Sequence, residues 1–456
     1  MTAPLRADAA HVTEAAIAAV RPETLLPRRL AWRGGEFLLD GRPFSTPVRP
    51  TGRIAVVGGG KAAAGMAAAL ETLLESGALG LVSVPEGCGR MLERIEVRET
   101  RPAAANLPTG AVVEATRAMR GLLESLGPAD LAVVVVTGGG SALLEEPAAG
   151  VELADVIAVT RFLSAAGADI RELNVVRQAV SLVKAGGLAR ACTAGRLVAV
   201  VLSDVIGDPL DLIASGPCMP VGPAPDAALA ILRRHAAVEV APRVTRHLER
   251  TVAVAALAAP AAPDGAWTTP AGCRVSHVLV GSNATAVDAA AMAARDRGYD
   301  VTTRHAAAVI ESADDVGRRL ATEAAGLVAA ARRDGRPRAV IEGGEAVVTL
   351  PRDHGTGGRN QQTVLAAFEA WRREAGAWPA GLLIASVGTD GEDGPTNAAG
   401  GFADAEVATR LAANPDLPRA IARCDAGPAL AAAGGLVVTG PTGTNVADVR
   451  IVLARP

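Results

Sequence analysis

The segment from Leu131 to Pro147, LAVVVVTGGGSALLEEP, constrains the fold of this chain more than any other. It opens with an unbroken β-branched run, Val133 to Val136, which suits a strand buried on both faces in a parallel sheet. Three glycines follow, and then a helix-forming run at 142–146. Glycines let an anion approach the main-chain N–H groups, and the positive end of a following helix would attract it. The segment therefore predicts a phosphate-binding loop.

Strands and helical segments alternate along the chain, which indicates an α/β fold. We expect a Rossmann-like, doubly wound, mainly parallel sheet in a large N-terminal domain, with a smaller α/β C-terminal domain. The predicted strands are 53–57, 79–84, 133–136, 196–202, 275–280, 338–341, 382–386, 436–439 and 449–453. The predicted helices are 9–20, 62–74, 112–126, 142–146, 153–166, 173–188 and 361–371.

The 456 residues exceed the roughly 250–300 at which one hydrophobic core usually stops growing. Two domains are therefore expected, 1–255 and 256–456, with part of 270–320 able to pack with the N-terminal domain. The Ala- and Pro-rich stretch 236–270 is expected to contain the connection between them.

Composition narrows the function classes. Aromatic residues make up 2% of the chain and the formal net charge is -3, which argues against a nucleic-acid groove or a basic membrane face. The five cysteines are scattered, so neither a disulfide framework nor a zinc site is indicated. The first 23 residues lack the long apolar core of a signal peptide. We expect a cytoplasmic protein that binds small molecules; a homodimer is compatible with the sequence.

Two basic residues stand where a cation is electrostatically unfavourable. Lys61 follows Gly58 to Gly60 where a helix should begin, and Arg359 follows a glycine-rich loop just before another helix. A positive side chain is disfavoured at a helix N-terminus unless an anion offsets it. Both residues therefore indicate binding of a carboxylate or a phosphoryl group, with a solvated surface side chain as the alternative.

Aspartates follow two predicted strands at their carboxyl ends, where α/β enzymes place catalytic groups. Asp204 is a candidate base or magnesium ligand, weighed evenly against a structural role. Asp208 precedes Pro209, the pattern of an ordinary helix cap, which favours a structural role for it over a functional one. Asp390 and Asp393 lie among glycines, where a turn role is about as well supported as a functional one.

The turn Gly58–Ala63 also fits the dinucleotide fingerprint G-x-G-x-x-G/A. That pattern supports an alternative function, an NAD(P)H-dependent hydroxypyruvate reductase. The acidic residue that should bind the ribose is poorly placed, because Glu86 comes late and beyond Pro85. No Walker-type G-x-x-x-x-G-K-[ST] motif is present.

Taken together, these loops resemble the class II glycerate 2-kinase family, whose C-terminal part is called the MOFRL domain and whose members are often labelled hydroxypyruvate reductases. The segments that carry the resemblance span nearly the whole chain in family order. They are GGGKAAAGMA at 58–67, TGGGSALLEEP at 137–147, SDVIGDPLDLIASGPC at 203–218, GSNATA at 281–286, GTGGRNQ at 355–361, GTDGEDGPTNAAGG at 388–401 and PTGTNVAD at 441–448.

The resemblance implies phosphorylation of D-glycerate, or of a related hydroxy or sugar acid, at its 2-hydroxyl by ATP with Mg²⁺. It also implies a site in the cleft between the two domains. The implied catalytic residues are Lys61, Asp204 and Arg359, and Asp208 and Asp390 are the metal candidates. The implied nucleotide- or substrate-binding residues are Gly59, Gly60, Gly138, Gly139, Gly140, Ser141, Ser203, Asn283, Asn360, Asp390, Thr444 and Asn445.

The chain departs from the family pattern at several polar positions. Arg101 begins a segment that is usually HPVPD-like, Glu342 stands in a motif that is typically SGGET, and Asn397 replaces an aspartate. Further changes fall at Gln362 and Ala447. The substitutions at Arg101, Glu342 and Asn397 support a third, non-catalytic reading, in which the chain is a sugar-acid binding or sensor protein whose kinase site has decayed.

Overall fold

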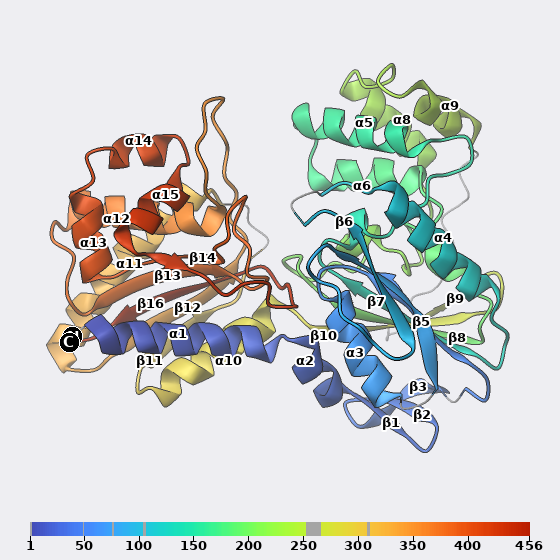
Figure 1. Cartoon of the computed structure of the whole chain (residues 1–456), viewed down its shortest axis with the longest axis horizontal. Coiled ribbons are helices and arrows are strands. Elements are labelled where there is room, and N and C mark those ends of the chain that lie inside the picture. The colour runs from blue at the N-terminus through green and yellow to red at the C-terminus, as the bar shows by residue number, and fades with distance from the viewer. Residues whose placement is uncertain (1, 49, 75–76, 104–105, 252–265, 308–310) are drawn as a thin grey trace. The chain divides into compact units, whose positions relative to one another are not determined.

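The computed structural model describes residues 2–48, 50–74, 77–103, 106–251, 266–307 and 311–456, which form two compact units (Figure 1). The parallel-sheet unit is Pro22–Val280, and the mixed-sheet unit combines the chain up to Arg21 with Gly281–Pro456. The expected boundary between residues 255 and 256 lies outside the described residues. The units differ from the expected domains because the first helix packs in the mixed-sheet unit, and because residues up to 280 complete the other sheet.

The parallel-sheet unit is built on a seven-stranded sheet of order β6-β5-β4-β7-β8-β10-β9. Strands β4 to β8 pair in parallel, and β9 runs antiparallel to β10. Every residue of β4, β7 and β8 is buried, as their apolar runs predicted. The strands are β4 (Ile54–Gly59), β5 (Ala78–Pro85), β6 (Ile95–Arg101), β7 (Leu131–Thr137), β8 (Arg196–Leu202), β9 (Trp267–Thr268) and β10 (Arg274–Gly281).

Helices of this unit confirm most of the predicted segments, with two corrections. The run at 142–146 forms no α-helix; a short 3-10 turn, η1 (Gly140–Ala142), takes its place. The predicted helix 173–188 is interrupted after residue 179. The helices are α2 (Pro22–Arg29), α3 (Ala63–Leu73), α4 (Gly110–Glu124), α5 (Leu153–Ala165), α6 (Ile170–Ala179), α7 (Gly187–Arg190), α8 (Pro225–Arg234) and α9 (Pro242–Arg250), with a second 3-10 turn, η2 (Ile213–Ser215).

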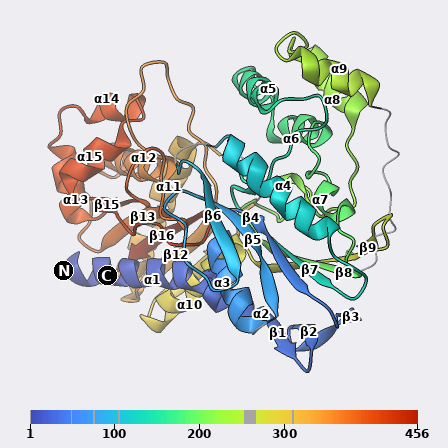
Figure 2. The same ribbon diagram turned by 45° about the vertical axis from the view of Figure 1, so that its right-hand side comes forward.

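Two smaller features complete the unit. Helices α5, α6, α8 and α9 gather around a hydrophobic cluster of their own, separate from the core beneath the sheet (Figure 1). A three-stranded antiparallel sheet is formed by β1 (Leu30–Arg33), β2 (Glu36–Leu39) and β3 (Arg42–Val48) (Figure 2). The helical cluster matters for the site, because α6 lines a cavity beside the glycine loop.

The mixed-sheet unit has a six-stranded sheet of order β11-β12-β16-β13-β14-β15. Only β11 and β12 pair in parallel, whereas the last strand, β16, runs antiparallel between β12 and β13. Unlike the first sheet, this sheet is therefore mostly antiparallel. The strands are β11 (Asp300–Arg304), β12 (Arg338–Gly344), β13 (Leu382–Gly388), β14 (Gly400–Ala403), β15 (Leu436–Val437) and β16 (Asp448–Ala454).

Helices cover both faces of this second sheet (Figure 1). One face packs against α1 (Thr2–Ala19) and α10 (Asn283–Asp296), and the other against α11 (Ala313–Asp334) and α12 (Arg359–Glu374). Three shorter helices follow at α13 (Ala405–Ala412), α14 (Leu417–Ala422) and α15 (Ala426–Ala433). None of the helices described in either unit is both long and apolar enough to cross a membrane.

Candidate active site

In the parallel-sheet unit, the predicted loops follow neighbouring strands at one edge of the sheet. The register pairs Gly59 of β4 with Val136 of β7, so the turns after these strands are adjacent. The N–H of Gly60 donates to the Ser83 carbonyl at 3.1 Å, and the N–H of Lys61 donates to the Gly138 carbonyl at 2.8 Å. These two amide groups therefore tie the loops together, and they are not available to hold phosphate as the fingerprint would require.

Gly60 is needed for this close approach. Its φ is +141°, and a Cβ there would lie 2.6 Å from the Thr137 carbonyl oxygen. A side chain would force β4 and β7 apart at their carboxyl ends.

The side chains of two basic residues pass close to the tip of the glycine loop. A Cβ placed on Gly139 would lie 3.5 Å from Nη2 of Arg101 and 3.6 Å from Cγ of Lys61. Arg101 ends β6, is 1% exposed, and donates through Nη1 to the carbonyls of Pro102 and Ala103 at 3.0 and 3.1 Å. Because a 3-10 turn and not an α-helix follows the loop, the expected helix dipole is missing there, and any attraction for an anion would have to come from the cationic side chains.

Arg101 is a candidate site residue that the sequence did not identify as such. The available signal was a permanently charged residue at the carboxyl end of β6, which β5 separates from β4, the strand that leads to Lys61. It stood out only as a departure from the family motif.

A strained turn supports the other side of the loop. Ala214, Ser215 and Gly216 have successive φ values of +51°, +62° and +63°, which non-glycine residues rarely adopt. The Ser215 hydroxyl donates to Oδ1 of Asn174 at 2.9 Å and lies 3.1 Å from the Ser141 hydroxyl. Because the Ser215 proton is used on Asn174, Ser141 is the donor in the second bond.

The aspartate loop after β8 lies at the same edge of the sheet, because β8 pairs in parallel with β7. Asp204 and Asp208 are both half-buried, and Asp208 has a left-handed φ of +54°. Asp208 does not cap an α-helix, since only η2 follows. Ser203 is buried and its hydroxyl donates to the Val205 carbonyl at 3.1 Å, so it holds the loop. Among the described residues, no group of three His, Cys, Asp or Glu side chains could hold a metal ion.

In the mixed-sheet unit, Arg359 is the first residue of α12 and forks onto one carboxylate. Its Nε and Nη2 donate to the two oxygens of Asp448 at 2.8 and 3.0 Å, and its Nη1 lies 3.0 Å from Glu345. Burial alone would lower the pKa of Arg359, but Asp448, with Glu345 and Asp390, raises it above its ordinary value. The guanidinium is thus held in place as a permanent charge.

Asp448 occupies the centre of this arrangement. It begins β16, paired with Gly344 on one side and Gly388 on the other, and its residue is 0% exposed. The Asn360 amide also donates to it at 3.0 Å, while Ser386 donates to the Asn360 carbonyl oxygen at 2.5 Å. Because it is buried and held by these hydrogen bonds, the Asp448 carboxylate fixes the orientation of the Arg359 guanidinium.

The N-terminus of α12 is capped by a residue distant in sequence. Gly358 offers no side chain, and the carboxylate of Asp393 accepts the N–H groups of Asn360 and Gln361 at 3.0 and 2.8 Å. Burial raises the pKa of Asp393 to about 7, against the effect of these two donors. Asp393 therefore caps α12 from a loop distant in sequence, a role that the sequence did not indicate.

Comparisons with known proteins assign the chain to a family. Residues 8–249 match the family described as "Domain of unknown function (DUF4147)", and residues 338–448 match the MOFRL family. The chain is 34% identical to human glycerate kinase over 99% of its own length and 94% of that protein. The chain belongs to the class II glycerate 2-kinase family.

Two further relatives from Thermotoga maritima agree with this family. A D-glycerate 2-kinase from that organism is 34% identical, covering 88% of this chain and 90% of the relative. The crystal structure of a Thermotoga maritima glycerate kinase superposes with a TM-score of 0.79 and 31% identity, covering 99% of both chains.

In this member of the glycerate 2-kinase family, several residues that were expected to bind ligands use their side chains for hydrogen bonds within the protein. The Asn283 amide donates to the carbonyls of Val446 and Asp448 at 2.8 and 2.9 Å, and the Thr444 hydroxyl donates to the Val20 carbonyl at 2.6 Å. Asn445 accepts the Ala447 N–H at 3.3 Å. Asp390 accepts the Glu392 N–H at 3.1 Å. Direct ligand contacts by these residues stay predictions.

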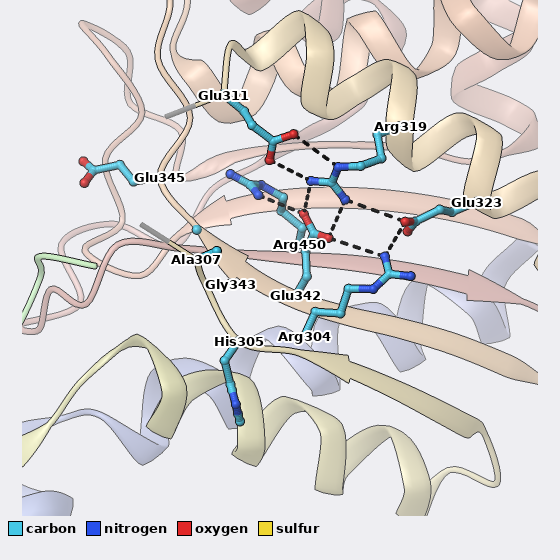
Figure 3. Close-up of a pocket in the computed structure, with 11 residues that line it drawn as sticks. Arg304, His305, Ala307, Glu311, Arg319, Glu323, Glu342, Gly343, Glu345 and Arg450 are labelled. Carbon is cyan, nitrogen blue, oxygen red and sulfur yellow. Dashed lines mark hydrogen bonds and ion pairs between the residues drawn. The ribbon is translucent and has the colours of Figure 1, made fainter. Parts of the chain in front are cut away.

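A cavity of about 300 Å³ adjoins the Arg359 fork, with Glu345 in its wall (Figure 3). Glu342 is 3% exposed there and accepts from Arg319 at 2.8 and 2.9 Å and from Arg450 at 2.8 Å. Burial alone would raise the pKa of Glu342, but these guanidiniums lower it. The glutamate that departs from the family motif is therefore part of a matched charge network.

Proposed function

We propose that this protein is a glycerate kinase that transfers the γ-phosphoryl group of ATP to the 2-hydroxyl of D-glycerate. Family membership and the names of its full-length relatives support the reaction. The observation that carries the proposal is the close approach of the Lys61 and Arg101 side chains to the tip of the glycine loop. Two cations beside a loop without side chains suit the phosphates of a nucleotide.

Each unit contributes groups suited to phosphoryl transfer, which relies on positioning and on neutralising charge. Lys61 and Arg101 would bind phosphate oxygens, and Asp204 would orient or deprotonate the attacking hydroxyl. Arg359, held by Asp448, would bind the substrate carboxylate or the moving phosphoryl group.

Magnesium fits the carboxylates that are present. Mg²⁺ usually takes one or two protein carboxylates and completes its shell with phosphate oxygens and water. Asp208 or Asp390 would supply such an oxygen, and the bound ion would neutralise phosphate charge. Mg²⁺ and the roles of both aspartates remain part of the proposal.

The reductase alternative has one observation in its favour. Glu86 directly follows β5 and is exposed, which is where a dinucleotide fold places its ribose-binding acid. Against it, the amide groups of Gly60 and Lys61 are already donated to carbonyls of neighbouring loops. The kinase reading fits the loops better.

The decisive experiment measures ADP release with ATP, Mg²⁺ and D-glycerate, alongside NADH oxidation with hydroxypyruvate. We expect glycerate-dependent ADP release and no NADH oxidation. Coupling the product directly to enolase, without a mutase, reports 2-phosphoglycerate and thus the phosphorylated position. NADH oxidation without ADP release would replace the kinase by the reductase, and ATP binding without turnover on any hydroxy acid would favour the decayed binding protein.

A further inference from the structure

Arg177 lies beside the glycine loop but was not predicted as a site residue. It projects from the last turn of α6 and lines a small cavity together with Ser141, Glu145 and Thr160. The cavity holds about 20 Å³, which is roughly the room that one water-sized group needs. A single oxygen atom of a larger ligand would fit there.

The charges around this cavity leave Arg177 without a counter-ion. Glu145 is bound to Lys184 at 3.0 Å, and both side chains are almost fully buried. Lys184 also donates to the carbonyls of Ser141 and Leu144 at 3.0 and 2.6 Å. Within the described residues, the guanidinium of Arg177 makes no hydrogen bond and no ion pair. One glutamate thus faces two cations.

The solvation of Arg177 supports the same view. Burial lowers the pKa of its guanidinium, and the negative charge of Glu145 only partly opposes this effect. A half-buried cation that lacks a partner costs free energy unless a ligand supplies the negative charge.

Ser141 cannot be the donor to such a ligand in the observed arrangement. Its proton points to Ser215, whose own proton goes to Asn174. Asn174 and Arg177 are three residues apart on α6 and so lie on one face of the helix. The same face of α6 therefore carries Asn174, which fixes the Ser141 hydroxyl through Ser215, and the guanidinium of Arg177.

We propose that Arg177 binds one oxyanion oxygen of the substrates at the cavity beside Ser141. The oxyanion is a phosphate of the nucleotide or the carboxylate of the hydroxy acid, and both offer the same hydrogen-bond chemistry. The inference rests on the proposed function, because it assumes that one of these ligands occupies the glycine-loop edge.

The test compares ligand binding by titration calorimetry in the full-length wild type and three variants. Arg177→Met removes the charge while keeping apolar bulk, Arg177→Lys keeps charge without the fork, and Arg171→Met changes an exposed arginine on the same helix. ADP, D-glycerate and inorganic pyrophosphate are titrated separately. We expect Arg177→Met to weaken binding of one substrate class by about ten- to a hundredfold. Arg177→Lys should be intermediate, and Arg171→Met should match wild type.

The pattern across ligands identifies the oxyanion. Loss of ADP and pyrophosphate affinity with unchanged glycerate affinity assigns Arg177 to the nucleotide phosphates, and the reverse assigns it to the carboxylate. Wild-type affinity of Arg177→Met for all three ligands would overturn the inference, as would a wild type that binds none of them. If wild type binds pyrophosphate but forms no ADP with glycerate, the proposed function fails while the pyrophosphate comparison still decides the role of Arg177.

A structural role gives a different result in thermal unfolding. Removing an uncompensated buried charge should leave the Tm of Arg177→Met unchanged or higher. Lys184→Met should lower Tm, because it leaves Glu145 buried without its partner. An Arg177→Met variant that lost as much Tm as Lys184→Met would mark Arg177 as structural and refute the proposal.

Discussion

Replacing Asp448 by asparagine tests whether its carboxylate organises the arrangement around Arg359 in the mixed-sheet unit. The substitution keeps the shape of the side chain but removes its charge. The amide oxygen can still accept one N–H, while its NH₂ group meets the donors of Arg359 or Asn360. At least one short, charge-assisted hydrogen bond is therefore lost.

The expected cost follows from the exposure of the two partners. Exposed ion pairs contribute about 0–1 kcal/mol, and breaking a buried pair costs about 3–5 kcal/mol. The Asp448 side chain is 1% exposed and that of Arg359 is 33% exposed, so this pair is intermediate. We expect Asp448→Asn to lower the free energy of unfolding by about 2–3 kcal/mol.

The same change should reduce turnover more than substrate binding. Arg359 keeps Glu345 as a partner but loses the fork that fixes the plane of its guanidinium. Loss of one oriented, charged hydrogen bond in the transition state corresponds to a decrease in kcat of roughly tenfold to a hundredfold. Glu345→Gln is the matched control, because its side chain is 42% exposed, and it should cost below about 1 kcal/mol.

Urea unfolding and steady-state kinetics on the same preparations measure both effects. A free energy of unfolding within about 0.5 kcal/mol of wild type, together with an unchanged kcat, would refute the role given to Asp448. A stability loss without a kinetic effect would confine Asp448 to structure.

Three further predictions concern the loops. Lys61→Ala should abolish glycerate-dependent ADP release while the near-UV circular dichroism and Tm stay those of wild type; retained turnover would remove Lys61 from the mechanism. Gly140→Ala should destabilise by about 1–3 kcal/mol in urea, because its Cβ would lie 2.7 Å from that of Ala214. The control Gly121→Ala, which meets nothing within 4 Å in α4, should be neutral or stabilising. Asp393 has a pKa raised to about 7, so its stabilising contribution is complete below about pH 4 and is lost as pH rises through 7. Wild type should therefore lose about 2 kcal/mol relative to Asp393→Asn between pH 5 and 7, and parallel stability curves would contradict this pKa.

The sequence predicted the elements whose signal is local. β8 has the predicted bounds, 196–202, and β7 extends the predicted run 133–136 by a few residues at either end. In both, an apolar run buried on two faces is the pattern of a central parallel strand. The α/β fold with a mainly parallel first sheet follows from such runs alone.

The two helices that were predicted wrongly, 142–146 and 173–188, are both disrupted by contacts of the buried Lys184. Its ammonium group takes the carbonyl of Ser141, which would have accepted the N–H of Glu145 in a helix at 142–146, and that N–H donates to the Thr116 hydroxyl instead. To reach inward, the chain around Lys184 leaves the helical conformation, and Ala185 has a φ of +48°. A contact between segments about 40 residues apart thus overrode the propensity of both.

The direction of β16 was equally beyond local reasoning. A buried apolar run at 449–453 marks a strand, but nothing within it tells whether it lies at an edge or between two earlier strands. The structure inserts it antiparallel between β12 and β13, which brings Asp448 next to Gly344 and Gly388. That insertion therefore places the Asp448 carboxylate where it can orient Arg359.

Candidate site residues drew attention where the sequence breaks a local rule and were overlooked where it obeys one. Lys61 and Arg359 drew attention because a cation before a helix is unfavourable without an anion. Arg177 sits in the last turn of α6, where a basic residue is favoured by the helix dipole, so its sequence context looks ordinary. That no described residue forms an ion pair with it becomes evident only in the structure, where Glu145 is paired with Lys184. The demand for a ligand is therefore a property of the packed charges, and it can be read only from the folded chain.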